Sequence, residues 1–283
     1  MSEQRARLGF FNRLSEIPFH ISFNQWLLVI FLLSFLSRVV VIFLLSNFSH
    51  ISGMENEAIA LNILHGKGYS YRFLDKELPS AYMSPVYTLF LYLHFLFFGE
   101  RNYFWVELSQ ALIGSFSAVL LVLIGKKLIN EKVGIFSGLL FAFYPIYVYW
   151  VTRAQQLVID IFLLELSIYC VIWSFQKESS WRHLLAGMVM GLTALSKTFY
   201  LSFPAFYWLW IWLWKKPGIR KAFLIAGLWA CGCIIVIMPW MIRNYRTFGE
   251  IIPITTNGGV NLWIGNNPKA TGGLYTKEQK PII

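Results

Sequence analysis

The sequence has few charged residues for its length. Of its 283 residues, 13% carry a charge and 57% are hydrophobic, whereas a soluble domain has about 25% charged and about 45–50% apolar residues. So little charge cannot cover the surface of a water-soluble globule. The composition therefore excludes a soluble enzyme and a disordered chain, and it predicts an integral membrane protein.

Cysteine is also scarce. Cys170, Cys231 and Cys233 all lie inside apolar runs, and an odd number of cysteines in such runs excludes a disulfide scaffold. The thiols of Cys231 and Cys233 would diverge on a helix, which disfavours a shared metal. We interpret all three as packing residues of membrane helices.

Long apolar runs, by contrast, are abundant. A membrane-spanning helix needs about 20 apolar residues. Five runs approach or reach this length: 25–45, 105–124, 133–150, 157–175 and 222–242. Two shorter runs, 184–196 and 199–214, are also interpreted as spans. The run 85–98 has only 14 residues, which is typical of a helix at the membrane surface. We predict an all-α, polytopic membrane helical bundle of about seven transmembrane helices, with further helices in the first outer loop.

Basic residues set the orientation. If the run 85–98 does not cross the membrane, four segments face the cytoplasm: 1–22, 125–132, 176–183 and 215–221. These segments hold 12 basic residues in 45 positions, against 9 in the 99 positions of the two long outer segments. This bias follows the positive-inside rule, and a crossing at 85–98 would reverse it. It also explains much of the net charge of +10, so no nucleic-acid partner is expected.

The predicted organisation follows from these spans. It comprises a cytoplasmic N-terminal segment (1–22), a first transmembrane helix (23–46), an outer loop with interfacial helices (47–104), a six-helix transmembrane region (105–242) and an outer C-terminal segment (243–283). The two outer segments are the long ones, and function tends to lie on such loops.

Two acidic residues follow the first predicted transmembrane helix. Glu55 and Glu57 begin an amphipathic stretch that Gly66-Lys67-Gly68 ends. Acidic residues at a helix N-terminus stabilise the helix dipole. The same carboxylates would also stand at the boundary between lipid and water, where a catalytic base can act. Both interpretations stay open, and Glu55 and Glu57 are the candidate catalytic residues.

Three basic residues on the outer side are candidates for binding an anionic donor. Arg243 and Arg246 are three residues apart where the last predicted helix emerges, so they share a helix face. Paired guanidiniums suit a phosphate or pyrophosphate, and snorkelling to lipid headgroups explains them equally well. Lys197 lies at a break between two apolar runs on the same side, where it would neutralise an anionic donor.

Charges inside predicted spans are costly and therefore informative. Arg38 lies in the first predicted helix, and Asp160 and Glu165 lie in the fourth. We interpret Arg38 and one of these carboxylates as a structural ion pair. The sequence does not decide which carboxylate is the partner.

Short motifs recur along nearly the whole chain. They are Glu55, Ile59-Ala60, Gly66–Ser70, Ala81–Tyr87, Phe98-Gly99, Gly191–Lys197, Pro239-Trp240, Arg243-Asn244, Phe248-Gly249 and Gly265–Asn267. In this order they resemble glycosyltransferase family 39, the group of protein O-mannosyltransferases and aminoarabinose lipid A transferases.

The resemblance implies a GT-C fold and transfer of a sugar from a polyprenyl-phosphate donor to an acceptor hydroxyl on the outer face. Glu55 best matches the family's first-loop acidic residue, which is proposed as general base. Lys197, Arg243 and Arg246 would stabilise the departing phosphate without a metal, so no cofactor is expected. The implied partners are the lipid-linked donor, a lipid, glycan or protein acceptor, and membrane lipids. The implied location is a bacterial inner or plasma membrane, with the N-terminus in the cytoplasm.

Two departures from the family keep alternatives open. Many relatives carry a second acidic residue in the loop that corresponds to 152–156, which here has none. Relatives also continue with further membrane helices, so the chain is expected to be truncated. An inactive fragment, or a subunit that binds lipid-linked sugar without transferring it, is therefore the alternative function. A transporter of lipid-linked sugar is a third hypothesis.

Overall fold

The protein is mostly helical in a computed structural model, which describes residues 21–45, 54–73, 76–177, 179–214, 218–268 and 270–271. The predicted all-α membrane bundle is confirmed, with one small β-hairpin added. The chain divides into two compact units, residues 1–52 with 102–189 and residues 53–101 with 190–283. The predicted cytoplasmic segment 1–22 lies almost wholly outside the described residues.

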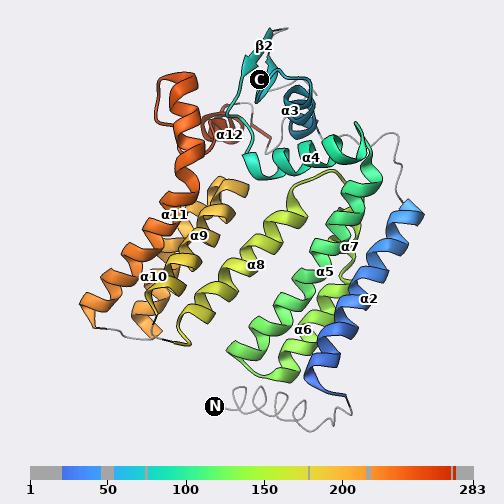
Figure 1. The fold of residues 1–283 in the computed structure, drawn as a ribbon, viewed down its shortest axis with the longest axis vertical. Helices are drawn as coiled ribbons and strands as arrows, with labels where there is room; N and C mark the ends of the chain where they lie inside the picture. The colour runs from blue at the N-terminus through green and yellow to red at the C-terminus, as the bar shows by residue number, and fades with distance from the viewer. Residues whose placement is uncertain are drawn as a thin grey trace. The chain divides into compact units, whose positions relative to one another are not determined.

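The first unit is a helical bundle (Figure 1). Its elements are α2 (Phe23–Leu45), α5 (Tyr103–Leu128), α6 (Glu131–Phe143), α7 (Pro145–Tyr149), the 3-10 helix η1 (Trp150–Thr152), α8 (Leu157–Ser174) and the first half of α9 (Ser180–Ser196). Glycine allows α5 and α6 to pack closely, because a Cβ at Gly125 would lie 2.7 Å from the Gly134 Cα. The Asn130 side chain caps α6 by accepting a hydrogen bond from the Val133 N–H at 2.9 Å.

The run 133–150, predicted as one helix, is bent in the structure. The α6 helix ends at Phe143, and α7 begins at Pro145 with a bend of 52° between the two segments. Proline has no N–H to donate and restricts the residue before it, so it begins a new helix at its first turn. The break therefore follows from one residue that an apolar run does not reveal.

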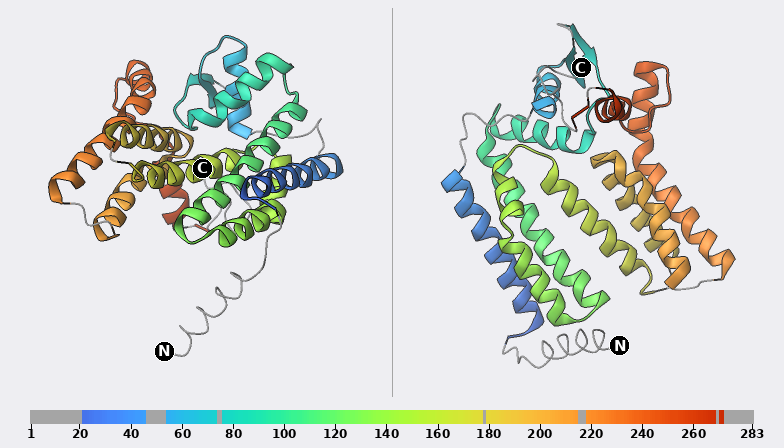
Figure 2. Two further views of the ribbon diagram at one scale, coloured as in Figure 1. Left: turned by 60° about the horizontal axis from the view of Figure 1, so that its bottom comes forward. Right: turned by 180° about the vertical axis from the view of Figure 1, so that it is seen from behind.

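The second unit combines a small β-hairpin with further helices (Figure 2). Its elements are α3 (Met54–Leu64), β1 (Ser70–Phe73), β2 (Lys76–Pro79), α4 (Pro85–Phe98), the 3-10 helix η2 (Thr198–Ser202), α10 (Phe203–Trp214), α11 (Ile219–Phe248) and α12 (Asn257–Asn266), with the end of α9. Strands β1 and β2 pair antiparallel, with Ser70 opposite Pro79. The α11 helix continues beyond residue 242, so Arg243 and Arg246 are both helical.

Four of the described helices are long and apolar enough to cross a membrane: α2, α5, α8 and α11. The bent pair of α6 and α7 makes a fifth if it is one span. The other two predicted spans fall on α9 and α10, which have 17 and 12 residues. Helix α4 is a shorter apolar helix with the bounds predicted for it.

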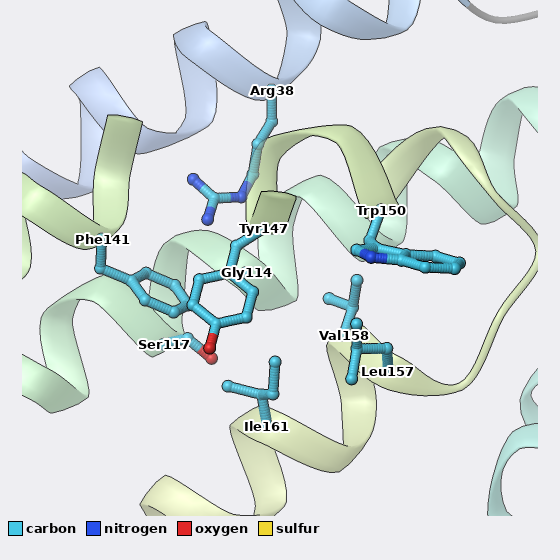
Figure 3. Close-up of a pocket in the computed structure, with 9 residues that line it drawn as sticks. All are labelled: Arg38, Gly114, Ser117, Phe141, Tyr147, Trp150, Leu157, Val158 and Ile161. Carbon is cyan, nitrogen blue, oxygen red and sulfur yellow. The ribbon is translucent and has the colours of Figure 1, made fainter. Parts of the chain in front are cut away.

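A buried arginine lies inside the first unit (Figure 3). Arg38 is fully buried, and its Nη1 donates to the Ser34 carbonyl at 3.0 Å and the Ala142 carbonyl at 3.4 Å. Its guanidinium lies 5.4 Å from the Phe141 ring centroid and interacts electrostatically with Glu165. The cavity beside it has a volume of about 10 Å³, room for about one water molecule. Arg38 is thus held by carbonyl groups, with Glu165 as an electrostatic neighbour.

Candidate functional site

A cavity of about 520 Å³ lies at the hairpin in the second unit. Residues from the start of α3, from both strands, from the segment before α4 and from α12 form its walls. They are Glu55, Tyr71, Arg72, Phe73, Leu78, Pro79, Ser80, Tyr82 and Val260. A volume of this size is typical of small-molecule sites. Of the five predicted site residues, Glu55 is the one that lines it.

A tight turn brings β1 back beside α3. Gly66 and Gly68 have φ angles of 75° and 69°, a left-handed conformation that glycine adopts without steric cost. The Lys67 N–H donates to the Asn62 carbonyl at 2.8 Å, and the Asn62 side chain donates to the Ser70 carbonyl at 3.1 Å. The turn that was predicted to end the helix therefore also fixes the first residue of β1. As a result, Tyr71 and Glu55 share one cavity.

The charge of Glu55 affects the pKa of two nearby tyrosines. Burial raises the pKa of the Tyr71 and Tyr82 hydroxyls above the ordinary value of 10.0, and the Glu55 carboxylate raises both further. Both phenols are therefore neutral hydrogen-bond donors at neutral pH. A carboxylate beside two phenols offers a polar ligand one acceptor, two donors and two ring faces.

Glu57 occupies a different environment from Glu55. Its Oε1 accepts a hydrogen bond from Arg101 Nε at 2.8 Å, and its side chain is 12% exposed. Arg101 has a φ of 57°, an uncommon conformation for a residue with a side chain. Glu57 is not among the residues that line the Glu55 cavity in the described chain. The structure thus places it in an ion pair between α3 and the segment after α4, and its predicted catalytic role stays a prediction.

The three predicted phosphate-binding residues differ from one another. Lys197 is exposed, in extended backbone between α9 and η2, as the predicted break requires. Arg246 is exposed in the last turn of α11. Arg243 is half-buried, and its guanidinium donates to the Ser80 carbonyl at 2.6 Å and the Tyr69 carbonyl at 2.8 Å. None of the three lines the Glu55 cavity among the residues that are described.

Three residues of the cavity were not predicted as site residues: Tyr71, Arg72 and Tyr82. Tyr71 and Arg72 lie on a strand of four residues, too short to show a reliable alternation of polar and apolar side chains. A signal for Tyr82 was nevertheless present, because Tyr82 lies in the motif Ala81–Tyr87 that carries the family resemblance. Arg72 adds a positive charge to the wall of the cavity.

Metal ligands are not clustered in the part of the chain that is described. No group of three or more His, Cys, Asp or Glu side chains comes together there, and divalent-cation sites are usually built from several such groups. The prediction that no metal is needed stays a prediction.

A comparison with known proteins finds a match to one protein family. The family model for dolichyl-phosphate-mannose-protein mannosyltransferase matches residues 82–242, which is more than half of the chain. The match begins at Tyr82 of the cavity and ends at residue 242, within α11. No curated protein and no solved structure matches the chain.

Proposed function

This chain belongs to the dolichyl-phosphate-mannose-protein mannosyltransferase family. From that premise we propose that it transfers a sugar from a polyprenyl-phosphate donor to an acceptor hydroxyl on the outer face of the membrane. The family implies a membrane glycosyltransferase of the GT-C type. The observation that carries the finer proposal is the Glu55 cavity, where one carboxylate faces two neutral phenols.

Glu55 is the general base in this proposal. The acceptor oxygen attacks the anomeric carbon while the bond from that carbon to the phosphate oxygen breaks. The acceptor proton passes to the Glu55 carboxylate, and the polyprenyl phosphate departs with the bonding electrons. A single displacement of this kind inverts the anomeric configuration. Because the leaving group is already an anion, no general acid has to protonate it.

The tyrosines and the basic residues have distinct tasks. Tyr71 and Tyr82 bind the sugar through their ring faces and donate hydrogen bonds to its hydroxyls. Arg72 in the cavity wall and the exposed Lys197 and Arg246 provide positive charge for the departing phosphate. The acceptor is a lipid, glycan or protein that offers a hydroxyl. The proposal requires no cofactor.

A transfer assay tests this proposal. The purified full chain in lipid nanodiscs receives a radiolabelled polyprenyl-phosphate mannose and candidate acceptors. Glu55→Gln removes the base and is expected to lower the transfer rate about 10²–10⁴-fold. Glu100→Gln is the matched control, because this exposed carboxylate pairs with His65 away from the cavity. Equal transfer rates in the Glu55→Gln protein and the wild type would remove Glu55 as the base.

One observation favours a second candidate function, a subunit that binds lipid-linked sugar without transferring it. The segment 152–156 carries no carboxylate, although many members of the resembling family have one there. Instead, Gln110 fixes this part of the chain by donating to the Val151 carbonyl at 3.0 Å and the Arg153 carbonyl at 2.9 Å. This alternative predicts that the wild type binds the labelled donor and transfers none of it.

A further inference from the structure

The Arg243 guanidinium closes the open end of the hairpin. Its Nη2 donates to the Tyr69 carbonyl at 2.8 Å and its Nη1 to the Ser80 carbonyl at 2.6 Å. Tyr69 and Ser80 come one residue outside the last strand pair, Ser70 opposite Pro79, and the Ser80 N–H itself donates to the Tyr69 carbonyl at 3.0 Å. Arg243 therefore fastens both chains of the hairpin where they leave the sheet.

Aromatic rings enclose this guanidinium. Its central carbon lies 5.2 Å from the Tyr69 ring centroid, 5.1 Å from that of Trp240 and 5.7 Å from that of Phe248. These distances are within the range of cation–π attraction. Tyr69 is in turn fixed to the start of α4, because its hydroxyl donates to the Met83 carbonyl at 2.9 Å. Carbonyl groups and rings together hold the Arg243 side chain in one place.

The neighbouring Asn244 ties a second segment to the same point. Asn244 is fully buried; its Oδ1 accepts from Arg243 at 3.1 Å and its Nδ2 donates to the Ile252 carbonyl at 3.0 Å. The Trp240 indole donates to the Ile254 carbonyl at 2.8 Å, and the Thr256 N–H donates to the Ala81 carbonyl at 2.9 Å. This segment leads directly into α12, which supplies one wall of the Glu55 cavity.

We propose that Arg243 is a positioning residue of the Glu55 cavity, which holds the hairpin and the segment 252–256 in place, rather than a ligand of the donor phosphate. Its two terminal nitrogens already donate to carbonyl groups, and its flat faces already meet aromatic rings. Binding a phosphate through these nitrogens would break the contacts that shape the cavity. The proposal rests on the proposed function for its effect on transfer. The hydrogen bonds of Arg243 to the Tyr69 and Ser80 carbonyls, which we call the clamp, do not depend on activity.

The conservative substitution separates the two roles. Lysine has the same charge as arginine, but its ammonium group is compact. It cannot donate to two carbonyls in the fixed geometry of a guanidinium, and it has no flat face to stack on aromatic rings. A phosphate ligand would therefore keep much of its effect in Arg243→Lys. A positioning residue would lose its effect in Arg243→Lys and Arg243→Ala alike.

Trypsin cleavage of the full chain in nanodiscs tests the clamp without any activity. Lys67, Arg72 and Lys76 are exposed on or beside the hairpin, and cleavage there reports how often the hairpin opens. We expect cleavage at these sites to be about tenfold faster in Arg243→Lys and Arg243→Ala than in the wild type. Arg220→Ala is the matched control, because it removes an exposed arginine from the first turn of the same helix. Unchanged hairpin cleavage in the Arg243 variants overturns the proposal.

Kinetics then test the positioning role. In both Arg243 variants, kcat for sugar transfer is expected to fall about 10²-fold, while the donor KM changes less than about twofold. A raised donor KM that Arg243→Lys largely restores would establish a phosphate ligand and overturn the proposal. If Arg243→Ala does not fold, Arg243→Lys and Arg243→Gln carry both experiments. Absence of transfer in the wild type refutes the proposed function alone, since the cleavage result still decides the clamp.

Discussion

The Arg38 region and the Glu55 cavity both place charge among aromatic side chains, but they differ in the space around that charge. Arg38 is fully buried beside a cavity of about 10 Å³. Glu55 lines a cavity of about 520 Å³ whose other walls carry tyrosine and arginine. A charge packed on all sides can only hold structure, whereas a charge that faces an open volume can meet a substrate. An intramembrane charge alone is therefore a weaker sign of function than a charge with room beside it.

Removing the Arg38 side chain gives the largest expected loss of stability. Arg38→Ala would delete a fully buried side chain and its hydrogen bonds to Ser34 and Ala142. We expect a decrease of about 3 kcal/mol in the free energy of unfolding, measured by denaturant titration in detergent. Arg38→Met, which keeps most of the volume, separates packing from charge. If Arg38→Ala is as stable as the wild type, the Arg38 region is not tightly packed, and the contrast with the Glu55 cavity is wrong.

Gly114→Ala tests the same packing with a smaller change. A Cβ at Gly114 would lie 2.7 Å from Arg38 Nε, so this fully buried side chain would have to shift. We expect a loss of about 2 kcal/mol in unfolding free energy, read from the same titration. Gly227→Ala in α11 is the control, because a Cβ there meets no atom within 4 Å. Equal stability of the two alanine variants would contradict the tight packing at Arg38.

Tyr82→Phe gives the smallest expected effect and concerns the open cavity. It removes one hydrogen-bond donor beside Glu55 and should slow transfer about fivefold, the equivalent of one ordinary hydrogen bond. Because the pKa of Tyr82 is raised above 10.0, its hydroxyl stays mostly protonated up to pH 9. The rate ratio of wild type to variant should therefore be constant from pH 6 to pH 9. Tyr92→Phe on α4, outside the cavity, is the control, and a ratio that falls towards pH 9 would show that the hydroxyl ionises.

The long elements could be predicted from the sequence because their signals are local. Helix α4 has the predicted bounds: Pro85 occupies its first position, and Gly99 ends it with a φ of 96°. The break at Lys197 and the turn at Gly66 and Gly68 were likewise visible in the chain. The length of an apolar run and the residues that end a helix are local signals, so these elements can be predicted without knowing how the chain packs.

The site was only partly predictable because its contacts are distant in sequence. Arg243 meets Tyr69 and Ser80 across more than 160 residues, and nothing in its spacing from Arg246 distinguishes the two. Glu55 and Glu57 look equivalent in sequence. Because they are two residues apart on α3, their side chains point in different directions: Glu55 lines the cavity and Glu57 pairs with Arg101. Similarly, the choice between Asp160 and Glu165 as the neighbour of Arg38 depended on how α8 packs in its bundle.

The most direct test of the account is the rate of sugar transfer by the wild type and by Glu55→Gln, measured as kcat/KM in one nanodisc preparation. If Glu55 is the general base, the glutamine side chain cannot accept the proton of the acceptor hydroxyl, and the rate falls about 10²–10⁴-fold. The account is contradicted if Glu55→Gln keeps the wild-type rate.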